Sequence, residues 1–338
     1  MILLVSLLWF LQCGRKNQET PLMHGGLAAT DFRGKTLSFS RPPERIVCLI
    51  ESALSGLYML GAEDKVVGIS RNIYEDPVFS WYAAMDRRIG QKSLPTAGNW
   101  DFVSLESVLA LQPDLVLIWS KQTESIAALE ERDIPVFGIF LNSREDIFLE
   151  IRALGQLTGK KERAEELIRY AQKKIGEMEE SLRHRPSTPP PSVYFMWAQG
   201  LLETSGRSGM VNELIEMAGG RNAALQLPNE HMLINLETLL SWNPDLIVMW
   251  VDPRKEPGDI LQDPRLSSLR AVQSGRIHEL PEIFLCDFWT LKFLYASRLL
   301  SAWIFPQSYR NQDLEREKRE ILHFLYQGKL DGKVFSSR

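Results

Sequence analysis

Aromatic, charged and polar side chains follow several apolar runs of this 338-residue sequence, at positions where a parallel sheet would expose them. In open α/β sheets ligands lie beyond the carboxyl ends of the strands, so the residues just after each predicted strand are candidate ligand contacts. In the first half of the chain these candidates are Glu51, Ser52, Arg71, Tyr74, Asn99, Trp100 and Trp119. In the second half they are Trp197, Arg207, Trp250, Phe288 and Trp289.

The types of these residues indicate which ligand chemistry they suit. Tryptophan rings stack on flat or conjugated ligands, and the guanidinium groups of Arg71 and Arg207 can pair with an anionic group. Ferric chelates, corrinoids and haem fit this combination. Trp119 and Trp250 also end predicted buried strands, where packing explains them as well as ligand contact does. Trp289, in a polar loop, is a stronger candidate, as is Trp100.

The sequence offers no recognised catalytic motif and no set of metal ligands. It has no P-loop, GxSxG elbow, HExxH zinc site or GxGxxG turn after a strand. A bare zinc or manganese ion needs several converging histidine and carboxylate ligands. Of the five histidines, only His231 is placed to face a ligand, and His278 is typical of a structural residue. We therefore expect a binding protein without catalytic residues, metal or cofactor; an enzyme acting on a metal-cofactor ligand is the weaker alternative.

Strands and helices are predicted to alternate along both halves of the chain. The predicted strands lie at 45–50, 65–70, 113–119 and 134–140, then at 193–198, 244–250 and 276–281. This alternation predicts parallel α/β sheets. Between the halves, apolar residues at helical spacing predict one long helix over about 160–183, and the prolines of 184–192 end it.

The two halves also share a sequence repeat. Residues 105–119 (LESVLALQPDLVLIW) align without gaps on residues 236–250 (LETLLSWNPDLIVMW), with seven identical positions at an offset of 131 residues. Each copy predicts a helix, a Pro-Asp turn and a buried strand. The offset is too long for a solenoid unit of about 20–50 residues and indicates a duplicated domain.

Several blocks of the chain occur in the order of a known family. They are RPPERIVCLIESALSGLYMLGAEDKVVGIS, GNWDFVSLESVLALQPDLVLIW, ETSGRSGMVNELIEMAGGRNA and INLETLLSWNPDLIVMW. From about Asp31 to Phe305 the chain resembles the cobalamin and iron-siderophore class (class III) of periplasmic binding proteins of ABC importers. The resemblance implies two Rossmann-like lobes joined by one long rigid helix, with a ligand cleft between the lobes.

The function that this resemblance implies is capture of an iron-siderophore or similar metal chelate and its delivery to a membrane permease. A cobalamin or other corrinoid receptor, or a haem receptor, remains open. A receptor that signals without transporting is a third alternative. Family members dock on the permease dimer, which works with its ATPase, through one surface glutamate per lobe. Glu106 and Glu237 occupy the matching positions, although the helix dipole alone also favours acids there.

The N-terminal segment resembles a lipoprotein signal peptide. Residues 1–13 are almost wholly apolar, too short to span a bilayer, and end at Cys13, which would carry the lipid. We therefore expect an extracytoplasmic, lipid-anchored monomer. The net charge of -4 argues against nucleic acid as a partner. Cys48 and Cys286 lie in apolar segments and are expected to be buried free thiols.

These features divide the chain into six predicted parts. They are a signal peptide (1–13), a tether (14–30), an N-terminal α/β lobe (31–158), an interlobe helix (159–184), a C-terminal α/β lobe (185–305) and a C-terminal extension of open role (306–338).

Overall fold

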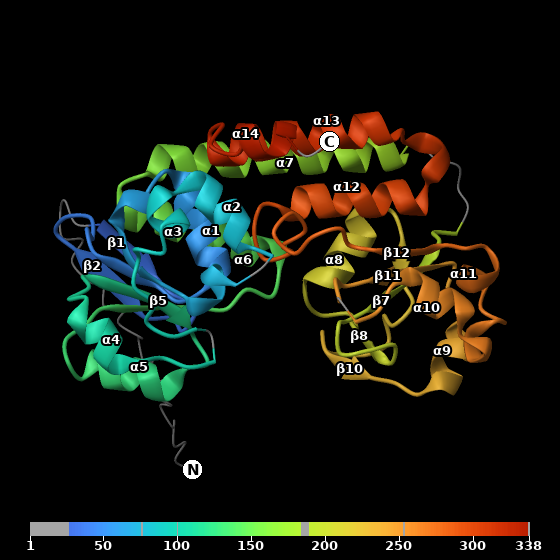
Figure 1. Ribbon diagram of the computed structural model, residues 1–338, viewed down its shortest axis with the longest axis horizontal. Helices are drawn as coiled ribbons and strands as arrows, with labels where there is room; N and C mark the ends of the chain where they lie inside the picture. Colours follow the sequence, from blue (N-terminus) through green and yellow to red (C-terminus); the bar gives the residue numbers. More distant parts are fainter. Residues whose placement is uncertain (1–26, 76, 100, 184–188, 253, 337–338) are drawn as a thin grey trace, which may run out of the picture.

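The fold has two α/β lobes side by side beneath a pair of long helices (Figure 1). A computed structural model describes residues 27–75, 77–99, 101–183, 189–252 and 254–336. The predicted fold class is confirmed. Among the helices of this described part, none is both long enough and apolar enough to cross a membrane.

The N-terminal lobe is built on a four-stranded parallel sheet in the order β4-β3-β5-β6. Its strands are β3 (Ile46–Cys48), β4 (Val66–Ile69), β5 (Leu115–Trp119) and β6 (Val136–Ile139). Its helices are α1 (Glu51–Leu60), α2 (Phe79–Met85), α3 (Arg87–Gly90), α4 (Leu105–Ala110), α5 (Thr123–Glu130) and α6 (Arg144–Thr158). The strands are apolar runs because helices cover both faces of the sheet: one core includes α1 and α6, and another includes α4 and α5.

The C-terminal lobe repeats this plan with the sheet order β12-β11-β7-β9. Its strands are β7 (Ser192–Met196), β9 (Arg221–Asn222), β11 (Leu246–Met249) and β12 (Ile277–Glu279), beside a small antiparallel pair of β8 (Glu203–Thr204) and β10 (Met232–Leu233). Its helices are α8 (Met210–Met217), α9 (Leu236–Trp242), α10 (Pro257–Gln262), α11 (Arg270–Gln273) and α12 (Phe293–Ile304).

The repeat seen in the sequence is also a structural repeat. α4 leads into β5, and α9 leads into β11, through turns of the same geometry. Gln112 and Asn243, which are 131 residues apart, both adopt left-handed φ angles, of 45° and 43°. Each turn is fastened by an aspartate: Asp114 Oδ2 accepts from the amide of Glu44 at 2.8 Å, and Asp245 Oδ2 accepts from that of Ser192 at 2.8 Å.

The helix between the lobes is α7 (Lys161–Arg183), which lies where the sequence predicts it. Its buried stripe runs from Ala164 through Leu167, Ile168, Ala171 and Ile175 to Met178. This stripe packs on α1 and α6 of the first lobe and on α8 and α12 of the second. A helix seated on both lobes limits their relative motion more than a flexible ribbon would.

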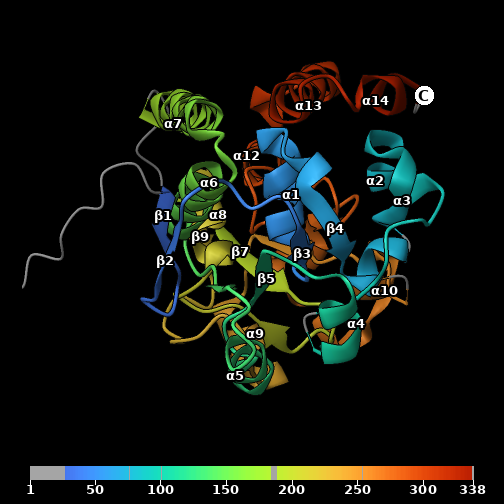
Figure 2. The same cartoon turned by 90° about the vertical axis from the view of Figure 1, so that its left-hand side faces the viewer.

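The C-terminal extension forms a second tie between the lobes. It comprises α13 (Asn311–Tyr326) and α14 (Asp331–Ser336), and α13 runs beside α7 (Figures 1 and 2). The Tyr326 hydroxyl hydrogen-bonds Ser55 of α1 at 2.6 Å, while Glu317 accepts from Arg298 of α12 at 2.9 Å. The extension, whose role the sequence leaves open, therefore holds both lobes at once.

The predicted tether extends too far into the chain. Residues Leu27–Thr30, placed by the sequence in the tether, form β1 and pair with β2 (Thr36–Phe39). The hairpin is fixed on the edge of the first sheet, because the Phe32 amide donates to Gly138 at 3.0 Å and Asp31 accepts from the Gly138 amide at 3.0 Å. These contacts are distant in sequence, so local periodicity does not reveal them. Cys13 and the signal segment lie outside the described residues.

Candidate functional site

Aromatic side chains gather beyond the strand ends of the C-terminal lobe. Trp197 follows β7, Trp250 follows β11, and Trp289 lies in the loop before α12. Their ring centroids are 5.4–6.3 Å apart, and His231 stacks on Trp197 at 4.5 Å. We call Trp197, Trp250, Trp289 and His231 the aromatic wall. The structure thus brings together three of the tryptophans selected by the strand-end rule.

Two members of the aromatic wall, Trp197 and His231, hydrogen-bond neighbouring residues of the C-terminal lobe. The Trp197 indole donates to the carbonyl of Glu230 at 3.2 Å, and His231 Nδ1 lies 3.0 Å from Glu203 Oε1. Trp197 is only 3% exposed, whereas Trp250 and Trp289 are half-buried and His231 is exposed. Trp250, Trp289 and His231 therefore present the accessible surface, and Trp197 supports it.

A smaller aromatic pair stands at the strand ends of the N-terminal lobe. Trp119 ends β5 and lies 6.5 Å, centroid to centroid, from Phe140, the residue after β6. Lys121 Nζ lies 4.8 Å from the centroid of the Phe140 ring, and Phe140 is 37% exposed. Sequence reasoning missed Phe140 because it extended the predicted strand by one residue.

The predicted arginines remain exposed. Arg71 follows β4 and forms a long ion pair of 3.8 Å with Glu75, while Arg207 lies in the loop before α8. Both side chains are therefore open to an anionic group of a ligand. Ser52 lies at the start of α1 and is half-buried, so its side chain is partly accessible.

Phe288 is not a contact residue. It is fully buried, 5.1 Å from the Trp250 ring and 5.8 Å from Phe195, so it belongs to the core behind the aromatic wall. The loop before α12 has no regular spacing by which sequence could separate Phe288 from the half-buried Trp289.

Two other predicted residues have structural partners, and one lies outside the described residues. The Tyr74 hydroxyl donates to the carbonyl of Leu94 at 2.7 Å, and the Tyr74 ring packs on Phe79. The Asn99 side chain closes a turn by accepting from the Phe102 amide at 2.7 Å. Trp100 is outside the described part of the chain, so its prediction stays open.

A buried charge cluster lies where the lobes and the extension meet. It consists of Glu51, Glu150, Asp287 and Lys292, which come from α1, α6 and the segment before α12. Lys292 is fully buried; its Nζ lies 3.5 Å from Asp287 Oδ2 and 3.8 Å from the Phe284 ring centroid. Oε1 of Glu51 and Oε1 of Glu150 are buried without a hydrogen-bond partner among the described groups.

The surroundings of this cluster shift the pKa values of its members. Burial raises the pKa of Glu51 to about 7, with a further rise from Asp287 that Lys292 partly offsets. Burial raises the pKa of Glu150 well above its usual range, and Asp287 adds to the shift. Burial alone would lower the pKa of Lys292, but Tyr326, Asp287 and Glu51 outweigh it and raise that pKa. Lys292 therefore stays charged at neutral pH.

Replacing Glu51 by glutamine is expected to remove part of the pH dependence of stability. Between its usual pKa and about 7, the folded protein holds a proton on Glu51 that the unfolded chain has released. The contribution of Glu51 to stability therefore falls as the pH rises through this window. Urea unfolding at pH 5, 6, 7 and 8 should show Glu51→Gln gaining stability relative to the native protein toward pH 8.

Glu75, whose side chain is 61% exposed, offers a control for this experiment. Glu75→Gln should leave the curve of unfolding free energy against pH parallel to that of the native protein. Parallel curves for Glu51→Gln as well would show that Glu51 does not titrate in this range.

Direct contacts also join the two lobes. The Trp81 indole of α2 donates to the carboxylate of Glu282, and the Trp81 ring stacks on Phe284 at 4.9 Å. The Arg144 amide donates to Glu213 of α8 at 3.1 Å. The sequence predicts neither these contacts nor the charge cluster, because their members are far apart in sequence and follow no motif.

The remaining predictions concern metal sites, cysteines and the two glutamates. Within the described ranges, no group of three or more histidine, cysteine, aspartate or glutamate side chains is placed to hold a metal ion. Cys48 and Cys286 are buried free thiols, as predicted. Glu106 and Glu237 are exposed in the first turns of α4 and α9.

Comparison with known proteins gives consistent matches. The periplasmic binding protein family model matches residues 46–283, which is more than half of the chain. An uncharacterized ABC transporter substrate-binding lipoprotein, YvrC, of Bacillus subtilis is 24% identical over 225 residues, 64% of this chain and 67% of that protein. A vitamin B12-binding protein of Pectobacterium atrosepticum is 23% identical over 211 residues, 61% of this chain and 71% of the relative.

A third match extends over more of the chain. The molybdate-binding protein MolA of Haemophilus influenzae is 22% identical over 329 residues, 88% of this chain and 90% of that protein. Its crystal structure with molybdate superposes with a TM-score of 0.75 at 20% identity, covering 89% of this chain and 98% of the other. This structural likeness establishes a shared fold.

Proposed function

Since the chain belongs to the periplasmic binding protein family, we propose that it captures an iron-siderophore or similar metal chelate and delivers it to the permease of an ABC importer. Membership confirms the family resemblance of the sequence motifs. The chain is a substrate-binding protein of ABC import and not an enzyme. The identity of the ligand and the residues that hold it are the proposal.

The observation that carries the ligand proposal is the aromatic wall. Trp250, Trp289 and His231 offer flat, partly exposed rings, which stack well on conjugated or aromatic ligand groups. Exposed Arg71 and Arg207 would pair with carboxylate or phenolate oxygens of an anionic chelate. In such a complex the chelator would supply the metal ligands, and the protein would bind the organic surface of the chelate.

A corrinoid or haem ligand is the second candidate. A relative of this chain is named as a vitamin B12-binding protein. Both corrinoids and haem have a broad macrocycle that could lie along the aromatic wall, with peripheral polar groups near the arginines. The exposed imidazole of His231, 3.0 Å from Glu203, would be available to such a ligand.

The proposed partner is a permease dimer with its ATPase. Glu106 and Glu237 would each meet an arginine of one permease copy, as the family resemblance implies. A monomer of the receptor would suffice for docking, because each of its two lobes presents one such glutamate. Cys13 would carry a lipid that anchors the chain to the outer face of the membrane.

The ligand class can be tested by titrating the intrinsic tryptophan fluorescence of the purified protein. Ferric siderophores, cobalamin, haem and molybdate form the panel. A ferric siderophore is expected to quench the fluorescence with a Kd of about 1 µM or lower. Trp289→Leu should weaken this binding at least tenfold, because it removes a half-buried ring of the aromatic wall.

Trp303 provides the matched control, because it stacks on His278 of β12 rather than joining the aromatic wall. Trp303→Leu should leave the Kd unchanged within about twofold. Quenching by cobalamin or haem alone would favour the second candidate, and a response to molybdate alone would replace the chelate by a small oxyanion. Equal effects of the two tryptophan variants would remove the aromatic wall from the site.

A further inference from the structure

Two exposed apolar side chains occupy equivalent positions in the two lobes. Among the large hydrophobic residues of the described part, Leu233 and Phe102 have the highest exposed fractions, 78% and 66%. They are separated by 131 residues, the offset of the internal repeat. Single exposed apolar residues are ordinary on a protein surface. Two at repeat-equivalent positions call for a common cause.

The backbone of each residue is hydrogen-bonded to its surroundings and lies just before a helix N-terminus. Phe102 is held by Asn99, whose side chain accepts from its amide at 2.7 Å, and Leu233 lies in β10, paired with Glu203 of β8. Two residues later, Ser104 and Asn235 cap α4 and α9 by accepting from the amides of Ser107 and Thr238. Both apolar residues therefore stand at the same distance in sequence from a capped helix N-terminus.

Each apolar residue stands four residues before a candidate docking glutamate. Phe102 precedes Glu106, and Leu233 precedes Glu237, in the first turns of α4 and α9. Both helices lie at the edge of the molecule away from α7 and α13 (Figures 1 and 2). The two pairs thus share one side of the protein.

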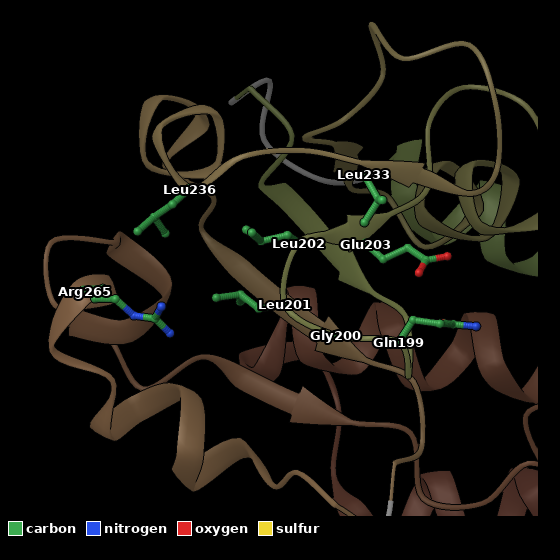
Figure 3. Close-up of a pocket in the computed structure, with 8 residues that line it drawn as sticks. All are labelled: Gln199, Gly200, Leu201, Leu202, Glu203, Leu233, Leu236 and Arg265. Atoms are coloured by element: carbon green, nitrogen blue, oxygen red, sulfur yellow. The ribbon is translucent and has the colours of Figure 1, made fainter.

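The surface beside Leu233 is also hollowed. A cavity of about 280 Å³ lies here, and its lining includes four leucines together with Gln199, Glu203 and Arg265. The leucines are Leu201, Leu202, Leu233 and Leu236. Figure 3 shows Leu201 and Leu202 between Leu236 and Leu233, with the guanidinium group of Arg265 extending toward them. The hollow offers a shaped apolar recess next to Glu237.

We propose that Phe102 and Leu233 are apolar anchors that insert into matching surfaces of two permease copies, beside the contacts of Glu106 and Glu237. The proposal rests on the proposed function, because it needs a permease partner. An apolar anchor that loses water at the centre of a contact supplies affinity, while a charge at its edge supplies orientation and encounter rate. A two-fold symmetric permease dimer requires the same pattern twice, which the duplicated lobes provide.

The test measures receptor binding and substrate uptake with vesicles that hold the permease and its ATPase. The full-length double variant Phe102→Ser/Leu233→Ser should bind the permease at least tenfold more weakly than the native protein. Its affinity for the substrate should stay unchanged within about twofold. Exchanging the anchors, in Phe102→Leu/Leu233→Phe, should retain permease affinity within about threefold, because both side chains stay apolar.

Leu149 provides a matched control. Leu149 is 53% exposed and lies on α6. This helix packs on α1 and α7, on the opposite face of the first sheet from α4. Leu149→Ser should bind the permease like the native protein. If it weakens binding as much as the double serine variant, the effect is a general loss of surface hydrophobicity and the proposal is wrong.

The glutamate variants separate failure of the anchors from failure of the proposed function. If Glu106→Arg/Glu237→Arg abolishes uptake while the serine variant takes up substrate normally, docking stands and the anchors are refuted. If neither variant changes uptake, the docking function itself fails. Should the serine variant instead dissociate a dimer of the receptor, as seen by sedimentation, a second copy of this chain covers the anchors and the permease proposal is overturned.

Discussion

Replacing Lys292 by methionine is expected to lower the free energy of unfolding by about 3–5 kcal/mol at pH 7. Lys292 is fully buried and is the cation within the buried charge cluster, 3.5 Å from Asp287. Methionine fills a similar volume but leaves Asp287 without its countercharge in a region that excludes water. The cost of an unpaired buried charge then exceeds any gain from a more apolar side chain.

The loss should depend on the charge of Asp287. In the double variant Lys292→Met/Asp287→Asn the unpaired carboxylate is gone, so the combined loss should be smaller than the sum of the two single losses. Urea unfolding of the four proteins at pH 7 measures this coupling. Lys173→Met is the control, because Lys173 is 76% exposed on α7 and its removal should cost less than about 0.5 kcal/mol.

The opposite result is equally informative. If Lys292→Met is as stable as the native protein, the carboxylates of the cluster take up protons at pH 7 and need no countercharge. The stability of the variant would then fall more steeply than that of the native protein as the pH rises above 7, because those protons are lost.

The sequence predicts the layers of this fold well, for physical reasons visible in particular segments. β5 and β11 are buried on both faces and therefore appear as unbroken apolar runs ended by tryptophan. α7 appears as a helical stripe because only one side of it touches the lobes. The sequence places β1 in the tether because Leu27–Thr30 has little strand propensity and forms a strand only through its pairing with β2 and the contacts of Asp31.

The candidate site was predictable only in outline. The strand-end rule finds Trp197 and Trp250, because their positions follow from topology. It cannot separate Trp289 from buried Phe288, since exposure in an irregular loop depends on what packs against it. The charge cluster joins residues as far apart as Glu51 and Lys292, and no local pattern marks such a meeting. Such contacts between the lobes form only when the chain folds, so they cannot be predicted from short stretches of sequence.

Reversing the charge of both Glu106 and Glu237 is expected to reduce uptake to the background level. Both residues are exposed, so Glu106→Arg/Glu237→Arg should fold normally and bind substrate with a Kd within about twofold of the native value. Uptake should fail because each lobe would meet a permease arginine with a like charge, which costs several kcal/mol at a close contact. Each single reversal should leave the other lobe able to dock and should reduce uptake at least tenfold.

The measurement is uptake of labelled substrate into vesicles that hold the permease and its ATPase, over a range of salt concentrations. Docking of the native receptor should slow as salt rises, since screening weakens the attraction between glutamate and arginine. Glu162→Arg, in the first turn of α7 on the far side of the molecule, should behave as the native protein does. A permease whose facing arginines are replaced by glutamate should restore uptake by the double reversal.

Two outcomes would contradict this account in different ways. If the double reversal takes up substrate normally, Glu106 and Glu237 are acids stabilised by their helix N-termini and nothing more. If it fails in uptake and the charge-swapped permease does not rescue it, the glutamates matter through another partner, such as a signalling receptor. Rescue by the swapped permease requires direct contact, because only facing charges can compensate each other.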